Sequence, residues 1–363
     1  MGAYLWTNDN QFGFKSGHST DQCVYALSEF IEYYKSRSTS IFVAFLDASK
    51  AFDKINHWVL FKKLINKHVP LYLVKILCFW YQQQSMYVRW GSTISTKFKV
   101  TNGVRQGGVL SPRLFNLYID GLSTILNRCQ IGGSIGGKRI NHMLYADDIC
   151  VISLSSRGLQ KLLSYCDAYC SEHDLVFNVK KSMCVFFRSS VNKKCGIPDI
   201  YLNSKCISFV EEVRYLGVLL HSRMKTSIDV ARQTRRFYSQ ANMLLRNFVH
   251  CSHDVKCMLF KSFCTNMYCC TLWFNSTKCS MRKLRVSYNN VLRRLLHIPK
   301  RSSASEMFVS RGIPSFYEVL RKSIYSFRER LACSNNTIIS ACLSPSISFF
   351  SPIRQWWNSI LYV

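Results

Sequence analysis

Three aspartates stand where the sequence predicts the ends of strands. Asp47 directly follows the apolar run 41–46, and Asp147 and Asp148 stand together between the apolar stretches 143–146 and 149–152. The first run is typical of a strand buried on both faces, and the second arrangement predicts a hairpin with the two acids at its turn. If these strands are neighbours in one sheet, the three carboxylates converge at one edge of it.

Such a cluster of carboxylates has a defined chemistry. Three close negative charges repel one another and need cations to persist, and hard oxygen ligands favour Mg²⁺ or Mn²⁺. Two such ions about 4 Å apart form the clamp used for in-line phosphoryl transfer. Each position also has a simpler interpretation, because an Asp after a strand often caps a helix and an Asp-Asp pair often forms a turn. Spacing alone does not decide between the two.

The composition indicates a partner that carries phosphates. The chain has 363 residues, and 48 Lys and Arg stand against 20 Asp and Glu, for a formal net charge of +28. Basic side chains displace condensed counterions from nucleic acids, which makes such an excess typical of nucleic-acid-binding proteins. A basic surface without a specific partner is the alternative.

The cysteines and the apolar segments indicate the compartment. There are 17 cysteines at irregular spacing, and the first ten residues carry no secretory signal. We therefore expect reduced thiols in an intracellular protein of the nucleus or cytoplasm, not a secreted one. The cluster Cys264, Cys269, Cys270 and Cys279 lacks zinc-finger spacing and favours core thiols. The apolar stretch 257–274 is interrupted by Lys261 and Asn266, so no membrane span is expected.

The periodicity predicts an α+β fold in two parts, with a boundary near residue 222. In the first part we expect helices over 18–35, 52–64, 111–125 and 156–171, strand and turn material over 86–101, a glycine loop over 132–137, and further strands at 175–179, 183–188 and 213–220. In the second part we expect helices over 227–249, 254–272, 280–297 and 314–333. On the helix 280–297, apolar residues are expected to pack inward and basic ones to meet phosphates. Residues 334–363 have no clear pattern.

Several blocks, in order, resemble the non-LTR (LINE-type) retrotransposon reverse transcriptases. The blocks are QFGFKSGHST (11–20), FLDASKAFD (45–53), NGVRQGGVLSP (102–112), YADD (145–148), NVKKS (178–182) and YLGV (215–218). The resemblance covers essentially the whole chain. It implies a right-hand polymerase, with partial fingers and a palm of antiparallel sheet and packed helices in residues 1–222. An all-α thumb and C-terminal region would follow in residues 223–363.

The resemblance also implies roles for the acids and one lysine. Asp47 and Asp147 would bind two Mg²⁺ or Mn²⁺ ions, with Asp148 assisting and the backbone carbonyl of Ala48 as a further ligand. Lys181 matches the lysine that protonates the leaving pyrophosphate. Its simpler interpretation is a solvated basic face.

Further residues would bind the substrates. Phe52 stands where the family places its steric gate against the ribose 2′-OH, although its spacing equally suits a helix core. The nucleotide and template pocket and the primer grip would be formed by Arg105, Gln106 and Gly107 and by Tyr215, Leu216 and Gly217, respectively. A glycine turn and an ordinary strand end are the alternatives for these two sets.

The implied function is an RNA-directed DNA polymerase that uses an RNA template, a DNA primer and dNTPs. Family members carry fingers segments upstream of the QFGF block, so we expect an N-terminally truncated form. A catalytically silent, nucleic-acid-binding remnant is therefore the second hypothesis. A group II intron maturase shares the palm, but the C-terminal helices favour the retrotransposon type. The sequence leaves the oligomeric state, the natural template and the priming site open.

Overall fold

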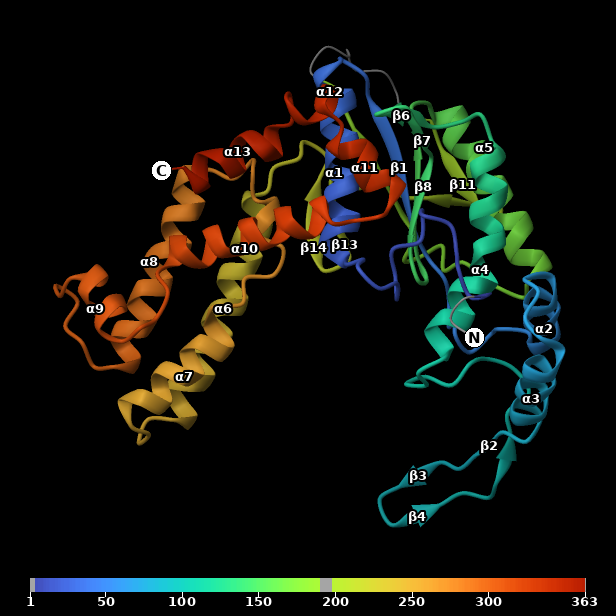
Figure 1. Cartoon of the computed structure of the whole chain (residues 1–363), viewed down its shortest axis with the longest axis horizontal. Helices are drawn as coiled ribbons and strands as arrows, with labels where there is room; N and C mark the ends of the chain where they lie inside the picture. Colours follow the sequence, from blue (N-terminus) through green and yellow to red (C-terminus); the bar gives the residue numbers. More distant parts are fainter. Residues whose placement is uncertain (1–3, 190–197, 363) are drawn as a thin grey trace.

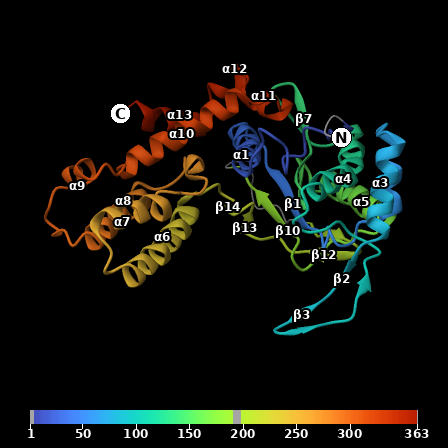
Figure 2. The same ribbon diagram turned by 60° about the horizontal axis from the view of Figure 1, so that its bottom comes forward.

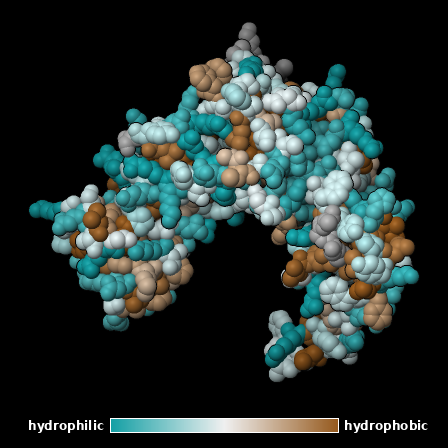
Figure 3. All heavy atoms as spheres, viewed as in Figure 1, coloured by the Kyte–Doolittle hydropathy of each residue, from teal (hydrophilic) through white to brown (hydrophobic). Residues whose placement is uncertain are grey.

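The computed structural model describes residues 4–189 and 198–362. The chain forms an arch whose two arms enclose a hollow (Figures 1 and 3). One arm carries α2, α3 and the strands β2 to β5, and the other carries α6 to α9. The top of the arch holds the central sheet and α1, and the last helices of the chain return to it. The predicted order of a mixed α+β part followed by a helical part is confirmed.

The central sheet is antiparallel and has the strand order β10-β1-β9-β8. The four strands are β1 (Ile41–Asp47), β8 (His142–Tyr145), β9 (Asp148–Ser153) and β10 (Met183–Phe187). Helix α1 (Thr20–Ser36) covers one face, while α4 (Ser111–Arg128) and α5 (Ser156–Glu172) cover the other. Because both faces are covered, β1 is apolar at successive positions, as the sequence predicts.

The arm beside the sheet differs in detail from expectation. It contains α2 (His57–Asn66), α3 (Leu71–Gln82) and a long hairpin of β2 (Ser85–Met86), β3 (Arg89–Trp90), β4 (Thr93–Ile94) and β5 (Phe98–Lys99). The prediction of a helix from Phe52 is wrong, because residues 49–54 form turns and α2 begins at His57. The Asn56 side chain accepts the N–H groups of Trp58 and Val59, which fixes that start.

Three other predictions about strands and loops require correction. Residues 132–137 are not a loop but include β6 (Gly133–Ile135), which pairs with β7 (Lys138–Ile140) around a Gly136-Gly137 turn. The predicted strand 175–179 is reduced to one isolated bridge between Ala48 and Phe177. The predicted strand 213–220 is a hairpin of β13 (Glu212–Tyr215) and β14 (Val218–His221), because Leu216 and Gly217 have positive φ. A further hairpin joins β11 (Ile200–Leu202) and β12 (Lys205–Ile207).

The second half is helical. Its main helices are α6 (Ser227–Asn247), α7 (His253–Cys264), α8 (Lys278–Leu295), α9 (Ala304–Ser310) and α10 (Phe316–Ala332). The helix predicted over 254–272 ends at Cys264, and a short 3₁₀ turn, η2 (Cys270–Leu272), follows Cys269 at φ 53°. On α8, Leu284, Tyr288 and Leu295 are buried as predicted.

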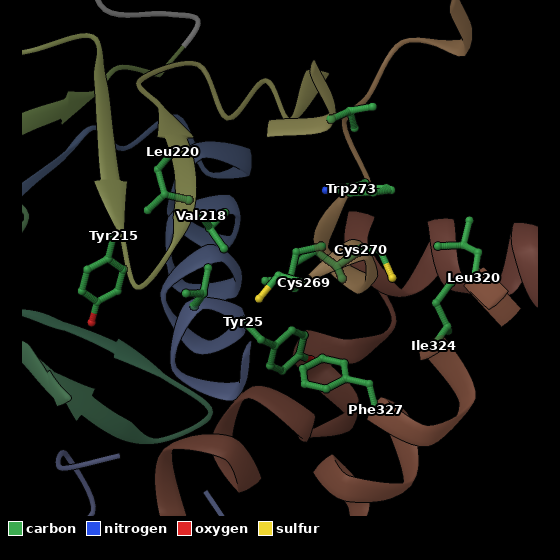
Figure 4. Packing of buried hydrophobic residues seen from close by; sticks show 14 of the residues in the cluster. Tyr25, Tyr215, Val218, Leu220, Cys269, Cys270, Trp273, Leu320, Ile324 and Phe327 are labelled. Carbon is green, nitrogen blue, oxygen red and sulfur yellow. The ribbon is translucent and has the colours of Figure 1, made fainter. Parts of the chain in front are cut away.

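Residues 334–362, for which the pattern predicts no element, form three helices that return to α1. They are α11 (Thr337–Leu343), α12 (Pro345–Ser348) and α13 (Pro352–Leu361). On α13 the Trp357 ring stacks on Tyr25 of α1 with 5.5 Å between ring centroids, and its Nε1–H donates to the carbonyl of Thr271. One hydrophobic cluster thus runs from α1 through the β13-β14 hairpin into the helical half, as Figure 4 shows around Tyr25, Trp273 and Phe327.

The buried cysteines pack in two hydrophobic clusters, one on each face of the central sheet. All cysteines of the described ranges are free thiols. Cys264, Cys269 and Cys270 are buried, as expected of core thiols, whereas Cys279 is exposed. None of the helices in the described ranges is long and apolar enough to cross a bilayer.

Candidate active site

Two of the three aspartates lie directly opposite each other on adjacent strands. Asp47 ends β1 and Asp148 begins β9, and the antiparallel register pairs these two residues. The two strands are buried as far as these positions, whereas Asp47 is half-buried and Asp148 is exposed. Residues at the same position of an antiparallel pair point to the same face of the sheet. Both carboxylates therefore lie on the face that also carries Phe45 and Cys150, which is the face covered by α1.

The third acid lies in the turn that joins β8 to β9. Tyr145 pairs with Asp148, so Ala146 and Asp147 form a two-residue turn. Ala146 has φ 55°, a conformation that L-residues adopt only at a cost. The prediction of a hairpin with the acids at its turn is confirmed, with Asp148 as the first strand residue after it.

The charges of the three acids affect one another. Burial raises the pKa of Asp147, and the negative charge of Asp47 raises it further. For Asp148, partial burial together with repulsion from Asp147 and Asp47 raises the pKa to about 6, although its side chain reaches solvent. Within residues 4–189 and 198–362, no three His, Cys, Asp or Glu side chains are close enough to enclose a metal ion. The three carboxylates are thus close enough to repel one another, but they do not surround one common point.

These residues fit a divalent cation in chemical terms. The donors are carboxylate oxygens, and a cation would relieve the repulsion that, together with the larger effect of burial, raises the pKa of Asp148. Lys181 stands nearby, with its Nζ 4.0 Å from Oδ2 of Asp47. Both side chains of that pair are substantially exposed, so the attraction is weak and leaves the lysine free to move.

The segment at the start of the chain holds the acidic turn, which the sequence did not indicate. Oε1 of Gln11 accepts the N–H groups of Ala146 at 2.9 Å and of Gly13 at 2.8 Å. A Cβ on Gly13 would lie 2.5 Å from the nitrogen of Ala146, so only glycine fits there. Nδ2 of Asn116 on α4 donates to the carbonyl of Gly13 at 2.6 Å. The QFGF block and α4 together therefore position Asp147.

Asp47 has its own support from the segment before β10. Its N–H donates to Oγ of Ser182 at 3.2 Å, and its carbonyl accepts the N–H of Asn178 at 2.8 Å. Ser182 Oγ in turn donates to the carbonyl of Asn178 at 2.9 Å. The block that supplies Lys181 thus fixes the backbone at Asp47. Ala48 follows directly, and its bridge to Phe177 continues this contact.

The block at 102–112 packs on the turns that follow Asp47. The N–H of Gly103 donates to the carbonyl of Ile55 and that of Val104 to the carbonyl of Phe52, each at 2.8 Å. Nε2 of Gln106 donates to Oδ1 of Asp53 at 3.0 Å. Arg105, Gln106 and Gly107 are exposed. The structure therefore brings two of the predicted substrate-binding blocks together through backbone contacts.

Phe52 lies in a turn rather than in a helix. Its ring stacks on Phe115 of α4, with 4.5 Å between centroids and 13° between the planes. The side chain remains partly exposed. The interpretation of Phe52 as helix core is therefore wrong, whereas a role at the substrate's sugar stays a prediction.

The predicted primer grip consists of a buried ring and a partly buried turn. Tyr215 is 4% exposed, its ring lies 4.9 Å from that of Phe45, and its hydroxyl is 3.3 Å from Sγ of Cys23. Leu216 and Gly217 form the turn, whose Leu216 carbonyl accepts the hydroxyl of Tyr268 at 2.7 Å. Tyr215 belongs to the core of the arch (Figure 4), so any contact with a primer falls to the turn.

The chain has a mixed α+β fold, in which an antiparallel sheet with acids at adjacent strand ends is followed by a helical half. Comparison with known proteins gives the family. The family model described as "Reverse transcriptase (RNA-dependent DNA polymerase)" matches residues 6–220. The chain belongs to this family.

Relatives among curated proteins come from mobile elements. The RNA-directed DNA polymerase from mobile element jockey of Drosophila funebris is 25% identical over 341 residues, which cover 90% of this chain and 36% of that protein. The probable RNA-directed DNA polymerase from transposon X-element of Drosophila melanogaster is 25% identical over 347 residues, covering 92% and 37%. The predicted resemblance to non-LTR retrotransposon reverse transcriptases is confirmed, and the chain spans little more than a third of these relatives.

Solved structures of telomerase are also similar. Apo telomerase from Candida tropicalis has a TM-score of 0.46 at 11% identity, covering 97% of this chain and 55% of that one. Telomerase from Candida albicans with a fragment of telomeric RNA has a TM-score of 0.43 at 13% identity, covering 100% and 51%.

Proposed function

We propose that this chain supplies the nucleotidyl-transfer site of a non-LTR retrotransposon reverse transcriptase. The observation that carries this proposal is the pairing of Asp47 with Asp148 across β1 and β9, with Asp147 in the adjoining turn. In the reaction, the 3′-oxygen of a primer forms a bond to the α-phosphorus of a dNTP. The bond from that phosphorus to the bridging oxygen breaks, and pyrophosphate leaves. An RNA template and a DNA primer select the dNTP.

The acids would hold two Mg²⁺ or Mn²⁺ ions. Asp47 and Asp147 are the ligands we assign to both ions, with Asp148 assisting and the carbonyl of Ala48 as a further donor. Bound ions would lower the pKa of the attacking hydroxyl and stabilise the charge of the transition state. Gln11 accepts the N–H of Ala146, and Ser182 accepts the N–H of Asp47. These hydrogen bonds limit the movement of the backbone that carries the acids.

Residues around the acids would bind and discriminate the substrates. Lys181 would give its proton to the leaving pyrophosphate, a role supported by its Nζ lying 4.0 Å from Oδ2 of Asp47. Phe52 would exclude a 2′-hydroxyl, and the exposed turn Arg105, Gln106 and Gly107 would contact the nucleotide and template. The turn of Leu216 and Gly217, with Tyr215 as its buried anchor, would hold the primer end.

Both halves of the chain would contact nucleic acid. We assign residues 1–222 to partial fingers and palm and residues 223–363 to the thumb and C-terminal region. The hollow between the arms would hold the template–primer duplex (Figure 3). Exposed basic residues of α8, such as Arg282 and Lys283, suit contacts with phosphates. Because its substrates are RNA and dNTPs, we place the protein inside the cell, in the nucleus or cytoplasm.

Primer extension tests this proposal directly. The purified chain is given an RNA template, a DNA primer, labelled dNTPs and Mg²⁺ or Mn²⁺. We expect incorporation that Asp147→Asn abolishes and that Glu172→Gln, an exposed acid at the end of α5, leaves unchanged. A folded wild-type chain that binds nucleic acid without any incorporation would contradict the proposal. That result would favour the second hypothesis, a catalytically silent remnant.

A further inference from the structure

The hairpin of residues 85–99 (β2 to β5) has no role in the site described above. It projects from the end of the α2–α3 arm, away from the rest of the chain, in both orientations of the ribbon (Figures 1 and 2). Every residue from 86 to 99 is exposed. The hydrogen bonds described for residues 86–99 stay within residues 84–100. The hairpin is therefore available to an external partner.

Its exposed side chains are unusually apolar and aromatic for a solvated hairpin. Trp90, beside the tip, is 86% exposed, and Tyr87 is 59% exposed. Met86 and Phe98, which pair across β2 and β5, are 42% and 46% exposed. Gly91 at φ 60° permits the tight turn after Trp90. Removing such rings from water is favourable, and on a projecting element only a binding partner can cover them.

The charges of the hairpin define the kind of partner. Between residues 84 and 101 there are three basic residues, Arg89, Lys97 and Lys99, and no acid. None of the ion pairs within the described ranges involves them. Rings interleaved with unpaired cations suit a polyanion whose flat bases stack on aromatic side chains. Only a single strand presents such bases, because a duplex already stacks them.

We propose that this hairpin binds single-stranded nucleic acid, with Trp90 and Tyr87 as stacking platforms and Arg89, Lys97 and Lys99 as phosphate contacts. The inference rests on the proposed polymerase function for the identity of that strand, which is the uncopied template outside the duplex. The hairpin lies at the end of the α2–α3 arm, and β3 and β4 are turned toward the open side of the arch (Figure 1). This position is outside the hollow in which we propose that the duplex binds.

Equilibrium binding in EDTA tests this inference without any catalysis. Fluorescence anisotropy would compare a labelled 15-nucleotide RNA with a blunt duplex of the same sequence. Stacking on one ring changes affinity roughly five- to 150-fold. We expect the double variant Tyr87→Ala/Trp90→Ala to bind the single strand at least about tenfold more weakly, with under about a twofold change for the duplex. Trp90→Phe would recover part of the loss, because it restores a ring.

Two matched controls separate stacking from charge and from folding. Trp58 on α2 is 72% exposed, and Trp58→Ala is expected to leave single-strand binding unchanged. Replacing Arg89, Lys97 and Lys99 by Gln together would reduce the salt slope of log K by about 2, since each phosphate contact with a single strand contributes about 0.7.

The outcomes distinguish this inference from the proposed function. If the chain extends primers but the hairpin variants bind single strands as well as the wild type, the inference is overturned and the polymerase stands; the rings would then be left for a protein partner. If the chain is inactive but the variants lose single-strand binding, the polymerase proposal fails and the hairpin site stands. A wild-type chain that does not bind single strands at low salt also overturns the inference.

Discussion

Oε1 of Gln11 accepts the N–H of Ala146 at 2.9 Å, which ties the beginning of the chain to the turn that carries Asp147. The same oxygen accepts the N–H of Gly13, and Gln11 is 1% exposed. One buried side chain therefore holds two backbone donors in place around a turn with a positive φ at Ala146. A loss of this acceptor leaves both donors without a partner in a dry environment.

From this relationship we predict that Gln11→Met lowers kcat at least about tenfold and destabilises the fold by about 1–3 kcal/mol, because two buried N–H groups lose their acceptor. KM for the dNTP should change less, since Gln11 lies beneath the turn. Single-nucleotide incorporation and thermal unfolding measure the two effects. Gln22→Met is the matched control, a buried glutamine on α1 that contacts Arg330 instead. Equal losses of kcat in both variants would contradict the positioning role.

A second prediction concerns Asp148, whose pKa is raised from 3.8 to about 6 by burial and by Asp147 and Asp47. A raised pKa means that the folded state favours the protonated acid. The stability that protonation of Asp148 gives the folded state is fully present below pH 3.8 and is lost as the pH rises through about 6. We therefore expect Asp148→Asn to stabilise the metal-free protein at pH 7.5 by about 1 kcal/mol or less, since the group is partly solvated, and to have no effect near pH 3.8.

Thermal unfolding with and without Mg²⁺ checks this prediction. In EDTA the Asp148→Asn variant should melt higher than the wild type at pH 7.5. Added Mg²⁺ should narrow the gap, because a bound cation offsets the repulsion in the wild type. A wild type that is the more stable of the two at pH 7.5 in EDTA would show that the three carboxylates do not repel one another.

A third prediction concerns Glu29, a buried acid on α1. Its Oε1 accepts the hydroxyl of Ser351 at 2.5 Å, and burial raises the pKa of Glu29 from 4.5 to about 7. The folded state therefore favours the protonated form, and its stabilising contribution is lost as the pH rises from about 4.5 through about 7. Glu29→Gln keeps an acceptor for Ser351 without the charge. We expect this variant to flatten the fall in melting temperature between pH 5 and 8, and an unchanged slope would contradict the prediction.

A fourth prediction concerns the return of the C-terminal helices to α1. Trp357 is 2% exposed, stacks on Tyr25 and donates to the carbonyl of Thr271. Trp357→Ala should cost about 3–5 kcal/mol, because it opens a cavity where three segments meet. Trp357→Phe, which keeps a ring but not the N–H, should cost less. Chemical denaturation measures both, whereas Trp356→Ala, a neighbour that is only partly buried, should cost least.

The sequence by itself determined the elements with a strong local signal. The apolar run before Asp47 and the turn at Asp147 and Asp148 each have their cause within a few residues, and the structure has both. Family resemblance then supplied the order of the blocks. Local patterns failed where short segments were decided by contacts, as at Phe52, which a turn withdraws from α2 to stack on Phe115.

Only the tertiary structure decided which distant residues support the site. Gln11 and Ala146 are 135 positions apart, and Asp47 and Ser182 are also 135 positions apart. No periodicity links such pairs, because their hydrogen bonds exist only after the strands pair. The placement of residues 334–362 has the same origin. Helices α11 to α13 are short, so they depend on packing against α1 and α10 for their stability.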